Sequence, residues 1–117
     1  MSKNVILEKS KTFAIRIIRL YQYLSSEKKE FVLSKQILRS GTSIGANVRE
    51  AHRGQSKKDF TAKMNIALKE AAETEYWLEL LHESGYMDDV SFESIYKDCN
   101  ELNKLLIVIV KSSSDNL

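Results

Sequence analysis

The residue pattern in this chain that is most typical of metal chemistry is Glu-x-x-His, formed by Glu79 and His82. On a helix, this motif binds iron in di-metal bundles, but such a site needs a second copy and two further inward-facing glutamates. The chain contains no second copy. We therefore expect no metal site here and no bound cofactor.

Two other patterns fall short of catalysis. The stretch at residues 41–45, GTSIG, lacks the Gly-Lys-Ser/Thr ending with which a phosphate loop binds phosphate and magnesium. The single cysteine, Cys99, has no orienting partner nearby, and its spacing with Ile95 and Leu102 is typical of a core residue. We therefore expect no catalytic residues and a protein that is not an enzyme.

A helix predicted over about residues 30–53 would sort its side chains onto three faces, because each residue turns by about 100°. The core-facing side consists of Leu33, Ile37, Gly41, Ile44, Val48 and Ala51. The opposite side is basic and consists of Lys35, Arg39, Arg49 and Arg53, with Thr42 and Ala46 between the pairs. A polar flank between them consists of Gln36, Ser43, Asn47 and Glu50, which we expect to contact a neighbouring helix or subunit.

Two glycines, Gly41 and Gly45, stand inside this predicted helix. Each costs roughly 1 kcal/mol relative to alanine, so close packing must compensate for them. Small residues gathered in one stretch let another backbone approach closely. The alternative is a loop at residues 39–43 that splits the helix in two.

Charge is unevenly distributed although the formal net charge is only +2. Residues 35–58 carry six cations against Glu50 alone, whereas residues 70–89 are acidic. In a cyclic oligomer every subunit repeats such a patch, so its phosphate affinity can add up. Glu73 is expected to meet Arg39 or Asn47, within or between subunits. The predicted phosphate contacts are Lys35, Arg39, Arg49, Arg53, Lys57 and Lys58.

The composition predicts an all-α protein of one domain over residues 1–117. Proline is absent and glycine occurs only four times, so helices can run long. Periodicity predicts helices at about 4–24, 30–53, 56–84 and 90–111. Ser26 and Ser56 are the expected N-caps of the second and third helices. Short connections favour an antiparallel up-down-up-down bundle.

Apolar runs in the chain are short. The apolar stretch at residues 105–110 is far below the roughly 20 residues that span a bilayer, and the start lacks a signal-peptide pattern. We expect a cytoplasmic protein with no membrane partner.

Several motifs in order carry a resemblance to a known family. They are QILRS at 36–40, SIGAN at 43–47, Glu50-Ala51, Asp59-Phe60 and ETEYWL at 73–78. With these motifs the chain resembles the four-helix-bundle proteins encoded in intervening sequences of bacterial 23S rRNA genes. The resemblance implies an antiparallel bundle that assembles into a ring, with a homopentamer favoured, and no established enzymatic activity. In a related group, the accessory proteins of diversity-generating reverse transcriptases, it implies a basic pentamer that engages nucleic acid and the polymerase.

Arg49 departs from the family pattern, in which a neutral residue more often precedes the glutamate, and makes this copy more basic. Two functions stay open. The first is non-enzymatic binding of RNA or DNA, with low specificity, through the basic face. The second is a protein-interaction scaffold that docks a partner such as a polymerase, in which the same cations form contacts between subunits.

Overall fold

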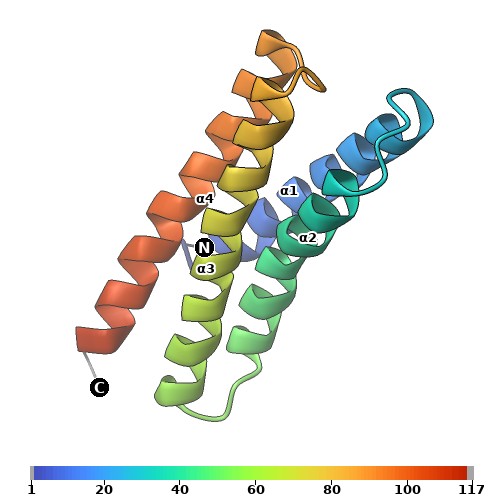
Figure 1. Cartoon of the computed structure of the whole chain (residues 1–117). Helices are drawn as coiled ribbons and strands as arrows, with labels where there is room; N and C mark the ends of the chain where they lie inside the picture. Colours follow the sequence, from blue (N-terminus) through green and yellow to red (C-terminus); the bar gives the residue numbers. More distant parts are fainter. Residues whose placement is uncertain (1, 116–117) are drawn as a thin grey trace.

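The computed structural model describes residues 2–115, with side chains from residue 5 onward. It contains four α-helices and no strand within that range: α1 (Ser2–Ser26), α2 (Leu33–His52), α3 (Lys57–Glu83) and α4 (Asp89–Asp115). Figure 1 shows the chain reversing direction after each helix, so that α1 lies along α2 and α3 lies along α4. The predicted all-α class with four helices is confirmed.

The start of α2 differs from the prediction because a carboxylate, and not Ser26, caps it. The Ser26 hydroxyl donates to the Gln22 carbonyl at 2.7 Å inside α1. The Glu30 carboxylate accepts the backbone N–H groups of Val32, Leu33 and Ser34 at 3.1, 3.0 and 2.7 Å. The carboxylate oxygens accept from amides that the helix itself leaves unpaired, so α2 begins at residue 33 and not at 30.

The N-terminus of α3 follows the prediction, whereas α4 is longer than expected. The Ser56 hydroxyl accepts from the Asp59 backbone N–H at 3.0 Å, as an N-cap does. Helix α4 continues to residue 115 and not to 111. Its last turns are held against α3 by a hydrogen bond between the buried hydroxyls of Thr61 and Ser113.

The core lies along the bundle axis, and the α1–α2 contact depends on Gly41. A Cβ atom at Gly41 would lie 2.7 Å from Cγ1 of Ile17, closer than carbon atoms pack. Helix α2 is unbroken through this point, so no loop forms at residues 39–43. The largest fully buried side chains belong to Phe13, Ile17, Leu24, Ile37, Ile44, Met64, Leu78, Leu81, Leu102 and Leu106.

Candidate nucleic-acid interface

The six predicted phosphate contacts fall into two groups along the bundle. Lys35 lies near the start of α2, and 14 residues of helix place it about 21 Å from Arg49 along the axis. Arg49, Arg53, Lys57 and Lys58 gather around the connection between α2 and α3, and all four are exposed. None of these four side chains has an ion-pair partner among residues 2–115.

Arg39 is engaged in a contact between helices. Its guanidinium lies 3.2 Å from the Glu70 carboxylate and donates a second hydrogen bond to Glu73, both on α3. The hydrogen bond to Glu73 and the charge of both carboxylates raise the pKa of Arg39 further above its usual value. Because α3 neutralises this charge, Arg39 is a weaker candidate for phosphate contact than the other five cations.

Glu73 joins this contact to an aromatic side chain. The Trp77 indole N–H donates to the Glu73 carboxylate at 2.8 Å. That bond, with the bonds and charge of Arg39, holds the pKa of Glu73 below its usual range despite partial burial. The meeting of Glu73 with Arg39 that the sequence suggested is therefore present within one chain.

The polar flank of α2 mostly bonds its own helix. The Ser43 hydroxyl donates to the Arg39 carbonyl at 2.6 Å, and the Asn47 amide donates to the Ser43 carbonyl at 2.9 Å. Gln36 is exposed. Only Glu50 reaches another helix, because its carboxylate lies 3.1 Å from Nζ of Lys63 on α3.

The buried polar contact between α2 and α3 was not predicted. The hydroxyls of Ser40 and Thr74 lie 2.9 Å apart and both residues are fully buried. Ser40 stands next to Gly41 on the core side of α2. Its position beside the apolar seam was the only signal in the sequence for this role.

A shallow groove between α1 and α2 brings a further cation to the candidate interface. Lys11 of α1 and Arg49 of α2 both line this groove, which has a volume of about 270 Å³ and a base that includes Ala14, Gly45 and Ala46. Helical periodicity could not pair Lys11 with Arg49, because the two residues are 38 positions apart in the sequence. We call Lys11, Arg49, Arg53, Lys57 and Lys58 the basic cluster.

Charge also divides between the two helix pairs. Residues 1–53, which include α1 and α2, contain eleven Lys and Arg against four Asp and Glu. Residues 54–117, which include α3 and α4, contain seven Lys and Arg against twelve Asp and Glu. Three of the five residues of the basic cluster therefore belong to residues 1–53, the part of the chain with an excess of positive charge.

The side chains considered for metal or nucleophilic chemistry are each engaged in a contact with a different residue. The Tyr96 hydroxyl donates to Glu79 at 2.5 Å, whereas Nε2 of His82 lies 2.7 Å from Asp89. Among the described residues, no group of three or more His, Cys, Asp or Glu side chains could hold a metal ion. Cys99 is fully buried, and burial raises the pKa of its thiol above the usual value, which disfavours the reactive thiolate.

None of the helices in residues 2–115 combines the length and apolar character that crossing a bilayer requires.

Comparison with known proteins identifies a family and a similar solved structure. Residues 2–108 match the model of the family described as 23S rRNA-intervening sequence protein. The chain is also similar to a crystal structure from Bacteroides thetaiotaomicron, described as a protein of unknown function from the S23 ribosomal protein family. The two are 61% identical, the match covers 95% of this chain and 99% of the other, and the TM-score is 0.93. No curated protein matches the chain.

Proposed function

The chain belongs to the 23S rRNA-intervening sequence protein family, and from that premise we propose that it is a non-enzymatic, cytoplasmic protein that binds RNA or DNA. In this proposal the helices form an antiparallel up-down-up-down bundle, and the bundles assemble into a ring, with five subunits favoured. The ring binds phosphate groups with low sequence specificity. The binding surface is the basic cluster, namely Lys11, Arg49, Arg53, Lys57 and Lys58.

The observation that supports this proposal is the exposure of these cations without acidic partners. Lys and Arg side chains that meet phosphates release condensed counterions, which gives affinity without reading bases. Arg39, by contrast, is already paired with Glu70 and Glu73. The basic cluster is therefore free of the carboxylate competition that a phosphate would meet at Arg39.

In a ring, the small basic cluster of each subunit is repeated, and the repeats together can bind one nucleic acid. One copy offers five cations, which corresponds to a salt slope of about −4.5 in log K against log[salt] if all five are engaged. In a ring, the second and later contacts become intramolecular and raise the overall avidity. A nearly neutral chain can therefore bind nucleic acid firmly when a long ligand spans several subunits.

The test is fluorescence anisotropy with a labelled RNA hairpin and a matching DNA duplex, each titrated at several salt concentrations. Wild type should bind with a steep salt slope. The variant Arg49→Glu/Arg53→Glu should lose detectable binding at 150 mM salt, since it reverses two of the five charges. The control Lys97→Glu/Lys104→Glu makes the same change in net charge on α4, away from the basic cluster, and should retain most of the affinity. Binding that is insensitive to salt, or equal in the two variants, would overturn the proposal.

The scaffold function remains the second candidate because of the charge division between the helix pairs. A basic α1–α2 pair on one copy could meet an acidic α3–α4 pair on the next. Under this hypothesis Arg49→Glu/Arg53→Glu breaks the oligomer before it affects any nucleic acid. Light scattering on the same variants therefore separates the two functions, because a ring that persists while RNA binding is lost favours the first.

A further inference from the structure

His52 is the last residue of α2 and stands among the residues of the basic cluster. Gly45, Arg49 and His52 follow one another at four-three spacing, so they lie along one side of the helix. Gly45 and Arg49 line the groove between α1 and α2, and His52 continues this line to the helix end that leads into the α2–α3 connection (Figure 1). Arg53 follows it in the chain. The exposed imidazole of His52 is therefore placed where the proposed function puts the phosphates.

Two contacts hold the imidazole of His52 in a defined orientation. Nδ1 lies 2.9 Å from the carbonyl oxygen of Val48, one turn earlier in the same helix. The ring also meets the ring of Phe60, on α3, in an edge-to-face contact with 5.5 Å between the centroids and 77° between the planes. Among residues 2–115, Nε2 has no hydrogen-bond or ion-pair partner. The ring is therefore fixed on the chain and leaves its second nitrogen available to a ligand.

The bond to Val48 determines which nitrogen of His52 carries the proton. A carbonyl oxygen only accepts hydrogen bonds, so Nδ1 must be the donor in both the neutral and the charged imidazole. In the neutral ring Nε2 is then an acceptor, which cannot bond a phosphate oxygen. Protonation converts Nε2 into a charged donor, which can. Because histidine side chains make this change between about pH 5 and 8, phosphate binding at this nitrogen switches near neutral pH.

The charged groups around His52 belong to α2 and to the two helices that pack against α2, namely α1 and α3. The described ones near this end of the bundle are Lys11 on α1, Arg49, Glu50 and Arg53 on α2, and Lys57, Lys58, Asp59 and Lys63 on α3. Of the two carboxylates, Glu50 lies 3.1 Å from Nζ of Lys63, and within the described part of the chain no ion pair joins Asp59 to His52. A bound phosphate, and not a carboxylate of the same chain, is therefore the partner that a protonated His52 lacks.

We propose that His52 is a sixth phosphate contact beside the basic cluster and makes nucleic-acid binding stronger at lower pH. Neutral His52 contributes no bond, whereas protonated His52 donates from Nε2 to a phosphate oxygen of the bound RNA or DNA. A phosphate beside the ring in turn favours the protonated form, so binding takes up a proton and the affinity rises as pH falls. The inference rests on the proposed function and names a regulation of the same site.

The test is the anisotropy titration repeated at pH 8 and pH 6, with RNA and DNA that carry hydroxyl ends so that their charge stays constant. One added phosphate contact corresponds to about fivefold tighter binding to the duplex at 150 mM salt, and to a salt slope steeper by about 0.9. Wild type should show both changes on going from pH 8 to pH 6. A purely structural role of His52 would alter stability but leave the salt slope equal at the two pH values.

Two substitutions at His52 and one at the other histidine isolate the effect. His52→Asn keeps a donor for the Val48 carbonyl, as Asn47 does for the carbonyl one turn before it, but cannot titrate, so its affinity should not depend on pH. His52→Lys carries a permanent charge and should bind at pH 8 about as tightly as wild type does at pH 6. The control His82→Gln changes the histidine that lies 2.7 Å from Asp89, outside the basic cluster, and should retain the pH dependence.

NMR of the imidazole nitrogens tests the orientation of His52 without any nucleic acid. Nδ1 should carry the proton in the neutral ring, and a proton on Nε2 instead would overturn the inference. Equal affinity of wild type at pH 6 and pH 8, or a pH dependence that survives in His52→Asn, would also overturn it, while a steep salt slope would leave the proposed function standing. A wild type that binds neither RNA nor DNA at any pH would instead overturn the proposed function, and this contact with it.

Discussion

Helix α1 packs against its two neighbours in opposite ways. Against α2, Gly41 and Gly45 bring the backbones so close that an added Cβ would meet Ile17 or the Ser10 carbonyl at 2.7 and 3.3 Å. Against α4, the contact consists largely of ion pairs at the surface and a cleft of about 580 Å³. The comparison indicates that α1 and α2 form one tight unit, whereas the α1–α4 side retains room for another molecule.

The largest effect on the free energy of unfolding should come from a larger side chain at the close contact between α1 and α2. Gly41→Leu places a side chain where even a Cβ would lie 2.7 Å from Ile17, and overpacking a well-packed core costs about 1–3 kcal/mol. We expect a loss of about 3 kcal/mol in the free energy of unfolding, measured by urea denaturation. Ala46→Leu, on the exposed side of the same helix, should change it by less than about 0.5 kcal/mol. Equal effects in the two variants would show that close approach is not what requires glycine.

The close contact between α1 and α2 was largely predictable from the sequence. The seam of α2 was visible as a four-three repeat, and all of its residues from Ile37 to Ala51 are buried. The small residues at 40–46 correctly indicated a close helix contact. Periodicity could not say which helix approaches, and that neighbour is α1, through Ile17 and Ser10.

Features that depend on distant residues were harder to predict. The cap of α2 was assigned to Ser26 because serine is a favoured N-cap, but an adjoining carboxylate, Glu30, can reach three amides at once. Arg39 was assigned to phosphate contact from its helix face, yet Glu70 lies 31 residues away in sequence and beside it in space. The cleft between α1 and α4 has no sequence signal, because it results from side chains that fail to meet.

A smaller effect should follow from removing the charge that caps α2. Glu30→Gln keeps one acceptor but loses the carboxylate that binds three backbone N–H groups, so we expect a loss of about 1 kcal/mol near neutral pH. Burial alone would raise the pKa of Glu30, but these bonds outweigh it and the net pKa is lowered. Wild type should therefore keep its full advantage above the unfolded pKa of about 4.3 and lose it as pH falls through the lower folded pKa.

Urea denaturation of both proteins from pH 7 down to pH 3 measures this difference. The curves of unfolding free energy should converge at the acidic end. A gap that is constant with pH would mean that the carboxylate contributes through its shape and not its charge.

The ion pairs between α1 and α4 should contribute less to the free energy of unfolding. Arg16 and Asp98 have side chains that are 36% and 43% exposed, and exposed ion pairs contribute about 0.2–1 kcal/mol. Arg16→Gln should lower the free energy of unfolding by an amount in that range at low salt. The difference from wild type should shrink in 1 M salt, because exposed charges are screened. A larger or salt-independent loss would mean that this bridge holds α1 to α4 in the way that the glycines hold α1 to α2.

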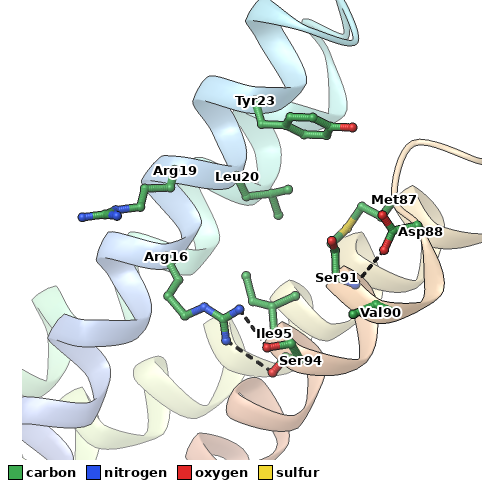
Figure 2. Close-up of a pocket in the computed structure, with 10 residues that line it drawn as sticks. All are labelled: Arg16, Arg19, Leu20, Tyr23, Met87, Asp88, Val90, Ser91, Ser94 and Ile95. Atoms are coloured by element: carbon green, nitrogen blue, oxygen red, sulfur yellow. Dashed lines mark hydrogen bonds between the residues drawn. The ribbon is translucent and has the colours of Figure 1, made fainter.

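The smallest effect on the free energy of unfolding should come from a larger side chain in the cleft between α1 and α4. Leu20→Phe adds a larger side chain to the cleft between α1 and α4, which Leu20 and Ile95 both line (Figure 2). Leu20 is only half-buried and borders open volume, so we expect a change within about 0.5 kcal/mol in the free energy of unfolding of the bundle. Urea denaturation of both variants measures the difference, and Gly41→Leu should show the larger loss in the free energy of unfolding. If Leu20→Phe destabilised the bundle as much as Gly41→Leu, the cleft would have to be packed in solution, and the contrast between the two sides of α1 would disappear.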